Sequence, residues 1–133
     1  MIIVDTSVAI KWLRSDEDGH ENALLFLKNH LEGREKIVVP GLFFIEAANA
    51  LATNTILSHD DVSEGMRFLF DVRLQEYSPT QKDIIDASIS AKTQGTSVYD
   101  MLYVIIARNK KTTVITSDKK FARKADSPFV KVI

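Results

Sequence analysis

Three short runs of aliphatic and β-branched residues constrain the fold of this chain more than any other feature. Ile2–Val4, Ile37–Val39 and Thr113–Thr116 are continuous rather than alternating, which is typical of strands buried on both faces of a parallel sheet. The stretches between them carry apolar residues at helical spacing. Strands that alternate with helices predict an α/β fold, a parallel sheet with helices on both faces.

Two weaker strands complete the expected sheet. Leu74–Tyr77 lies in the middle of the chain, and Val130–Ile133 is expected as an edge strand. Helices are expected where a capping residue or an amphipathic pattern marks them. The first expected helix begins at Thr6 or Ser7, the second covers Glu21–Leu31 and the third follows Pro40. The others are expected from Ser58 to Phe70, from Thr80 to Gly95, from Ser97 onward and from Asp118 to Lys124.

Two of these helices carry more detailed expectations. Pro40 suits the first turn of its helix, because its missing N–H would have no intrahelical partner there. The helix that begins at Thr80 is expected to turn five side chains inward. These are Ile84, Ile85, Ala87, Ser88 and Ala91.

Length and composition indicate one domain over residues 1–133, long enough to bury a core. The chain has no cysteine, which excludes disulfides and thiolate chemistry. No apolar run reaches the ~18 residues of a membrane span, and the N-terminus has no signal-peptide pattern. We therefore expect a cytoplasmic protein with no membrane partner.

Four carboxylates stand in apolar surroundings. Asp5 follows the first strand-like run, Asp118 follows the run that ends at Ser117, Glu46 interrupts an apolar helical stretch, and Asp100 opens another. A charge in such a place is costly unless it is paired or bound to a cation. Four such sites predict one convergent acidic pocket, and the simplest occupant of that pocket is a hard divalent metal ion.

Topology allows these side chains to meet. Parallel sheets bind ligands at the carboxyl ends of their strands, where Asp5 and Asp118 are expected. Asp100 suits the first turn of a helix, and Glu46 shares a helix face with Asn49, which could hydrogen-bond to it. Apart from Glu46, each acid also has an ordinary interpretation as a turn, cap or helix-dipole residue.

Two hydroxyls accompany the acids. Ser7 and Thr116 each lie two residues from an aspartate, Asp5 and Asp118 respectively. Each hydroxyl could orient a carboxylate or hold a metal-bound water, and each could equally cap a helix or fill space in the sheet.

The net charge of −1 does not point to nucleic acid, but the charge is unevenly distributed. The segment from Arg108 to Lys131 carries eight lysines and arginines and only two acids, Asp118 and Asp126. A basic segment next to an acidic site could guide a polyanion toward a metal. Lysines also decorate ordinary solvated helix faces, so both interpretations stay open.

These pieces together resemble the PIN-domain family, and within it the VapC toxins of toxin–antitoxin pairs. The matching segments are Ile3–Ser7, Pro40–Asn49, Ser97–Tyr103 with Ala107, and Val114–Phe121. No single segment is specific, because a triplet such as Asp-Thr-Ser occurs by chance in many proteins. The ordered set at this chain length is specific.

The resemblance implies a Rossmann-like PIN domain with a five-stranded parallel sheet and an endoribonuclease that cuts single-stranded RNA with Mg²⁺ or Mn²⁺. It places the metal-binding and catalytic motif at Asp5, Glu46, Asp100 and Asp118, with Ser7 or Thr116 as the accompanying hydroxyl. It also implies an RNA substrate, a VapB-like antitoxin protein and a homodimer.

Other functions are weighed against this one. A phosphatase of the haloacid-dehalogenase type needs a second aspartate two residues after the first, where this chain has Ser7. A phospho-receiver domain needs an acidic pair near its start, and Asp5 has no acidic neighbour. A non-catalytic RNA-binding or adaptor protein on the same fold is the remaining alternative, although it would not need all four acids.

Overall fold

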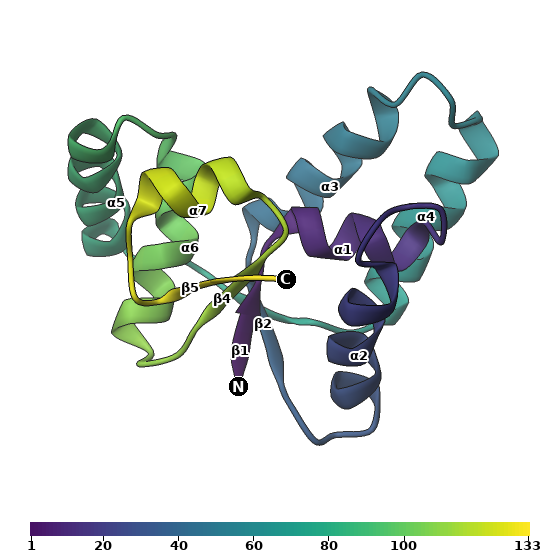
Figure 1. Ribbon diagram of the computed structural model, residues 1–133, viewed down its shortest axis with the longest axis horizontal. Helices are drawn as coiled ribbons and strands as arrows, with labels where there is room; N and C mark the ends of the chain where they lie inside the picture. The colour runs from purple at the N-terminus through teal and green to yellow at the C-terminus, as the bar shows by residue number, and fades with distance from the viewer.

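Five strands form one parallel sheet in the order β3-β2-β1-β4-β5 in the computed structural model, which describes residues 1–133 (Figure 1). Their bounds are β1 Ile2–Val4, β2 Ile37–Pro40, β3 Gln75–Tyr77, β4 Val114–Thr116 and β5 Val130–Val132. The central strand, β1, pairs through Ile3 with Val38 on one side and with Val114 on the other. The predicted α/β fold with a five-stranded parallel sheet is confirmed.

Seven helices connect and cover the strands. They are α1 Thr6–Leu13, α2 His20–Leu31, α3 Leu42–Ala52, α4 His59–Asp71, α5 Gln81–Gln94, α6 Val98–Asn109 and α7 Lys119–Ala125. Five of them begin at a side chain that accepts a hydrogen bond from the first turn, which satisfies backbone N–H groups that have no intrahelical partner. These capping residues are Asp5, Ser58, Thr80, Ser97 and Asp118. None of the helices combines the length and the apolar character needed to span a lipid bilayer.

Two hydrophobic cores lie on opposite faces of the sheet. Val4 and Ile115 point into the core formed with α1 to α4, while Ile3 and Val114 point into the core formed with α5 to α7. Successive residues of a strand face opposite sides of a sheet, so each of these strands needs an apolar residue at every position. Figure 1 shows the two groups of helices on either side of the strands.

Pro40 lies in a strand, contrary to the prediction that it opens a helix. It is the last residue of β2, where it pairs with Tyr77 of β3, and α3 begins two residues later. The chain tolerates proline there because β1 has already ended on the other side, so no ladder hydrogen bond from the Pro40 nitrogen is lost.

The inward face of α5 differs from the prediction. Ala87 and Ala91 are buried as expected, but Ile84, Ile85 and Ser88 are exposed. Asp83 takes the remaining inward position, with 3% of its surface exposed. Small side chains at 87 and 91 allow α5 to pack closely on α6, and the isoleucines therefore face outward.

Candidate functional site

Asp5 lies at the carboxyl end of the central strand, where it caps α1 with only 8% of its surface exposed. Its Oδ1 accepts hydrogen bonds from the Ser7 hydroxyl at 2.5 Å and the Ser7 N–H at 2.9 Å. Its Oδ2 accepts one from the Thr116 hydroxyl at 2.5 Å. Burial raises the pKa of the Asp5 carboxyl, although these hydrogen bonds act in the opposite direction.

The two hydroxyls are themselves held by the backbone after β4. The Ser7 Oγ accepts a hydrogen bond from the Ser117 N–H at 2.9 Å, and the Thr116 Oγ1 accepts one from the Asp118 N–H at 3.0 Å. Because each hydroxyl already accepts from the backbone, its own proton is directed toward Asp5. These hydrogen bonds connect Asp5 to the segment that carries Asp118, far away in the sequence.

Glu46 is half-buried on α3 and is held by a residue from α6. The Tyr103 hydroxyl donates to the Glu46 Oε1 at 2.9 Å and lies 3.3 Å from the Thr6 Oγ1. Burial raises the pKa of Glu46 to about 7, against the lowering effect of the Tyr103 hydrogen bond, and the charges of Asp100 and Asp5 raise it further. Glu46 therefore lies within electrostatic reach of both aspartates.

Asp100 and Asp118 line one pocket, with a volume of about 340 Å³, between the start of α6 and α7. The Asp100 Oδ2 accepts a hydrogen bond from the Thr96 hydroxyl at 3.1 Å. The Asp118 Oδ1 accepts one from the Phe121 N–H at 2.9 Å, because Asp118 caps α7. The remaining lining residues are Gly95, Ser97, Lys120 and Lys124.

The four acids do not form one compact cluster. Asp100 and Asp118 share a pocket, and Glu46 is affected by the charges of Asp100 and Asp5. No three acidic or histidine side chains lie close enough to hold a single metal ion together. Each carboxylate is turned toward donors of its own surroundings, as expected for like charges that have no counter-charge between them. The donor set fits Mg²⁺ or Mn²⁺ in its chemistry, because hard divalent cations prefer carboxylate oxygens.

Sequence patterns did not identify Tyr103 or Thr6 as members of the site. Tyr103 sits in an apolar helical run and resembles an ordinary core residue, with 2% of its surface exposed. Asn49, the expected partner of Glu46, is exposed and has no side-chain hydrogen bond to it. The only sequence signal was the tyrosine three residues after Asp100, which places both side chains on one face of α6.

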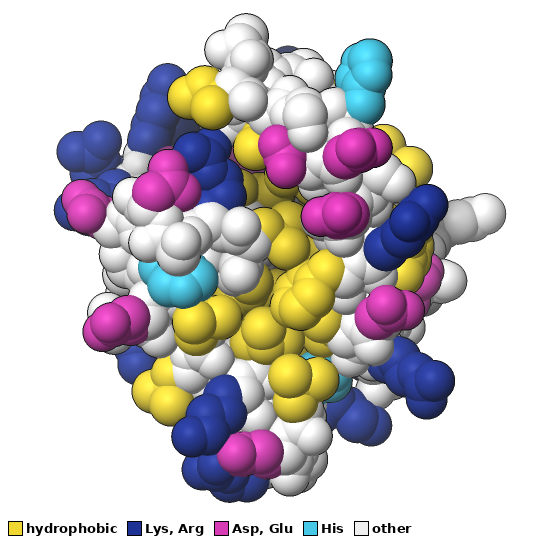
Figure 2. Space-filling model, turned by 90° about the vertical axis from the view of Figure 1, so that its right-hand side faces the viewer, with side chains coloured by type: hydrophobic (Ala, Val, Ile, Leu, Met, Phe, Trp, Pro, Cys, Tyr) yellow, Lys and Arg dark blue, Asp and Glu magenta, His cyan; other side chains and the backbone are white.

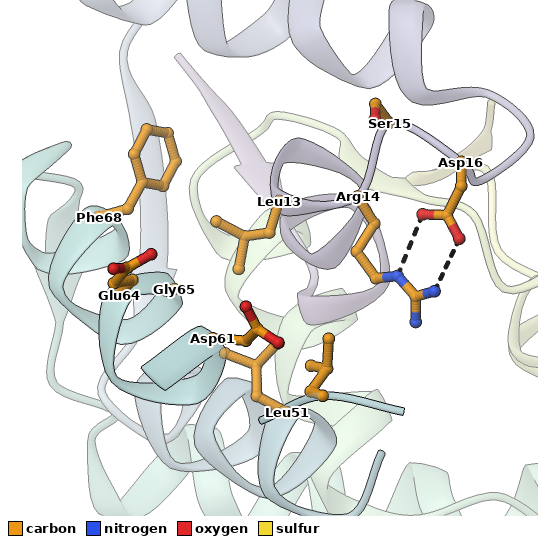
Figure 3. Close-up of a pocket in the computed structure, with 10 residues that line it drawn as sticks. Leu13, Arg14, Ser15, Asp16, Leu51, Asp61, Glu64, Gly65 and Phe68 are labelled. Carbon is orange, nitrogen blue, oxygen red and sulfur yellow. Dashed lines mark hydrogen bonds and ion pairs between the residues drawn. The ribbon is translucent and has the colours of Figure 1, made fainter. Parts of the chain in front are cut away.

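A separate groove lies on the opposite side of the molecule from α5, between α1, α3 and α4. Figure 2 shows hydrophobic side chains gathered in a hollow on this face, with acidic side chains at its edge. Its apolar lining comes from Leu13, Leu51, Leu57 and Phe68, and its acidic lining from Asp16, Asp61 and Glu64. Arg14, the one basic residue that lines it, already pairs with Asp16 at 2.8 Å (Figure 3).

The sequence matches the PIN domain family over residues 2–127. This chain belongs to the PIN-domain family. Comparison with curated protein sequences gives no match.

Solved structures share the fold of this chain at low sequence identity. The protein PAE2754 from Pyrobaculum aerophilum superposes with a TM-score of 0.72 at 19% identity, over 98% of this chain and 87% of that one. The sarcin–ricin-loop-cleaving toxin VapC20 from Mycobacterium tuberculosis gives a TM-score of 0.68 at 16% identity, over 92% of this chain and 94% of that one. A toxin–antitoxin complex from Klebsiella pneumoniae gives 0.67 at 16% identity, over 98% and 96%. At these identities the likeness establishes the fold of this PIN domain.

Proposed function

We propose that this PIN-domain protein is a metal-dependent endoribonuclease that cuts single-stranded RNA and acts as the toxin of a toxin–antitoxin pair. The observation that carries the proposal is the environment of Asp5. A carboxylate is buried at the carboxyl end of the central strand, oriented by two hydroxyls, and lies close enough to raise the pKa of Glu46. A purely structural aspartate would not need two further acids nearby, since their mutual repulsion destabilises the fold.

The residues that would hold Mg²⁺ or Mn²⁺ are Asp5, Asp100 and Asp118, with Glu46 as a direct or water-mediated ligand. When bound, the cation would orient the scissile phosphate, lower the pKa of a water molecule and stabilise charge on the leaving oxygen. Two observations support this set of ligands: Asp5 and Asp118 follow the neighbouring strands β1 and β4, and Asp100 lines the same pocket as Asp118.

The chain's own groups have separate tasks in this proposal. Ser7 and Thr116 fix the position of the Asp5 carboxylate through their hydroxyl protons. Tyr103 holds Glu46 through its hydroxyl, so that Glu46 could ligate the metal or position the attacking water. In-line attack by that water would leave a 5′-phosphate and a 3′-hydroxyl.

The test is cleavage of a labelled single-stranded RNA in Mg²⁺ or Mn²⁺ by the wild type and by Asp5→Asn and Asp100→Asn. Both variants should lose most of the activity, and EDTA should abolish cleavage by the wild type. Asp126→Asn is the matched control, because Asp126 is an exposed aspartate in the left-handed region, which asparagine tolerates. Cleavage by Asp100→Asn at the wild-type rate would refute the site assignment, and RNA binding that is unaffected by EDTA without any cleavage would favour the non-catalytic alternative.

A cytosolic ribonuclease endangers its own cell, so the proposal includes a VapB-like antitoxin protein as inhibitor. The Klebsiella pneumoniae structure that shares this fold is a toxin–antitoxin complex, which supports such a partner. An arginine or lysine of the antitoxin would pair with the site carboxylates through charge-assisted hydrogen bonds. The apolar groove with its acidic edge complements a second segment of that partner, one with apolar and basic side chains.

The proposal also includes a homodimer. Large hydrophobic side chains are exposed on α2 and α4, including Leu25 at 55% and Phe70 at 57%. The outward face of α5 adds Ile85 at 58% and Ile89 at 62%, one helical turn apart. A symmetric dimer is the commonest way to bury such surfaces in a soluble protein.

A further inference from the structure

The basic side of the pocket shared by Asp100 and Asp118 suggests how substrate is held. Lys120 and Lys124 both line that pocket, because residues four positions apart on a helix share a face. Lys119 and Arg123 precede each of them by one position on the same helix, and neither lines the pocket. Two of these four cationic side chains therefore line the pocket with Asp100 and Asp118, and the other two lie outside it.

Neither pocket lysine forms an ion pair within the chain. The ion pairs of the protein involve the N-terminus, Lys11, Arg14, Arg34, Lys82 and Arg108, and none involves a cation of α7. The Lys124 Nζ donates to the Gly95 carbonyl oxygen at 3.2 Å, which fixes it across the turn between α5 and α6. Lys120 has no hydrogen-bond partner in the protein and is exposed.

The pocket therefore has a division of charge that matches a phosphodiester with its metal ion. The same pocket is lined by two carboxylates, which could hold a cation, and by two ammonium groups, which could bind an anion. In the protein alone the four charges cancel, so a polyanion gains from the lysines mainly when a cation neutralises the acids. The Thr96 hydroxyl is committed to Asp100, and the Ser97 hydroxyl accepts from the Asp100 N–H, so the lysines are the pocket's strongest anion-binding groups.

We propose that Lys120, with Lys124 beside it, binds one phosphate of the RNA strand in the pocket that it shares with Asp100 and Asp118. This inference rests on the proposed ribonuclease function and assigns the phosphate subsite to one face of α7. Lys120 is a substrate-binding residue in this scheme, and Lys119, its neighbour in sequence, is not.

The test is RNA binding measured by fluorescence anisotropy across a salt series, in a Glu46→Gln background with Mg²⁺, which keeps the three aspartates of the metal site and is expected to leave the strand intact. Lys120→Ala should flatten the slope of log affinity against log salt by roughly 0.7, the value for one phosphate contact on a single strand. Loss of this contact should make binding roughly fivefold weaker at about 0.1 M salt, because one phosphate contact gains about 0.7 log unit of affinity when salt falls tenfold from 1 M. Lys120→Arg, which keeps the charge, should restore the slope.

Lys119→Ala is the matched control, since it removes the same side chain one position earlier from an equally exposed site. Its salt slope should stay at the parent value, and thermal melting of both variants should match the parent. Equal slopes for Lys119→Ala and Lys120→Ala would overturn the subsite.

Steady-state cleavage by otherwise wild-type protein separates this inference from the function on which it rests. Lys120→Ala should raise KM for RNA and leave kcat nearly unchanged, because the carboxylates are intact. A wild type that cuts no RNA rejects the nuclease proposal, whereas an active wild type with unchanged KM in Lys120→Ala rejects only the subsite.

Discussion

Replacing Asp83 with alanine should lower the free energy of unfolding by about 3 kcal/mol, although this residue lies outside the candidate site. Its carboxylate accepts hydrogen bonds from the Tyr77 hydroxyl at 2.7 Å, the Thr80 N–H at 2.9 Å and the Asn109 Nδ2 at 2.8 Å. These donors come from the end of β3, the start of α5 and the end of α6. One buried carboxylate therefore joins three elements.

The magnitude follows from the exposure of the donors. A hydrogen bond to a charged group contributes about 1.5–3 kcal/mol when its donor is left unpaired, and about 1 kcal/mol when that donor can turn to water. Tyr77 is half-buried, so loss of its hydrogen bond should cost near the lower end of the range of about 1.5–3 kcal/mol. Thr80 and Asn109 are exposed, so loss of each of their hydrogen bonds should cost about 1 kcal/mol or less. In a domain of this size such a loss lowers Tm by roughly 10–15 °C.

The pH dependence has a defined sign. Burial alone would raise the pKa of Asp83, but the hydrogen bonds from Thr80, Tyr77 and Asn109 lower it below the usual 3.8. A carboxyl with a depressed folded-state pKa contributes stability that is complete above its unfolded-state value and is lost as pH falls through the folded one. The gap between wild type and Asp83→Ala should therefore be full at pH 7 and should narrow below about pH 4.

Urea unfolding followed by circular dichroism would measure both effects. Tyr77→Phe removes one of the three donors and should cost about a third to a half as much, near 1–1.5 kcal/mol. Asp86→Ala is the control, because Asp86 is the next aspartate on the same helix and pairs with Lys82 and Arg108 at the surface, where ion pairs contribute little. Equal destabilisation by Asp83→Ala and Asp86→Ala would refute this reasoning.

Two further outcomes test the proposed partners. Light scattering at tens of micromolar protein should give twice the 14.9 kDa of one chain, and a monomer would contradict the homodimer. Phe68→Arg places a cation in the acidic, apolar groove at a position that is 38% exposed, so it should weaken inhibition by a basic, apolar antitoxin without changing RNA cleavage. Inhibition of Phe68→Arg at the wild-type antitoxin concentration would exclude the groove.

The sequence predicted the sheet well because its strands carry their own signal. Ile2–Val4 and Ile37–Val39 are apolar at every position, and the structure places Val4, Ile37 and Val39 in one core and Ile3 in the other. The inward face of α5 was harder to predict, because hydrophobicity favoured Ile84 and Ile85. That face is instead decided by how closely α5 approaches α6 and by three hydrogen-bond donors to Asp83 that lie elsewhere in the chain.

The residues of the candidate site were likewise predictable only in part. Carboxylates in apolar runs are visible in a sequence, so Asp5, Glu46, Asp100 and Asp118 could be named before the fold was known. Partners across long sequence separations are not visible, and the link between Glu46 and Tyr103 spans 57 positions. The metal-binding role of the four acids stays a prediction.

The pairing of β1 with β4 has a consequence for the order in which the protein can be made. Asp5 leaves the ribosome before β4 does, because the Thr116 hydroxyl that orients it is translated 111 residues later. A nascent chain without β4 has no hydroxyl from that strand beside Asp5 and no Asp118. If the proposed function holds, an RNA-cutting enzyme assembled on RNA cannot become active before the ribosome has translated β4 and Asp118.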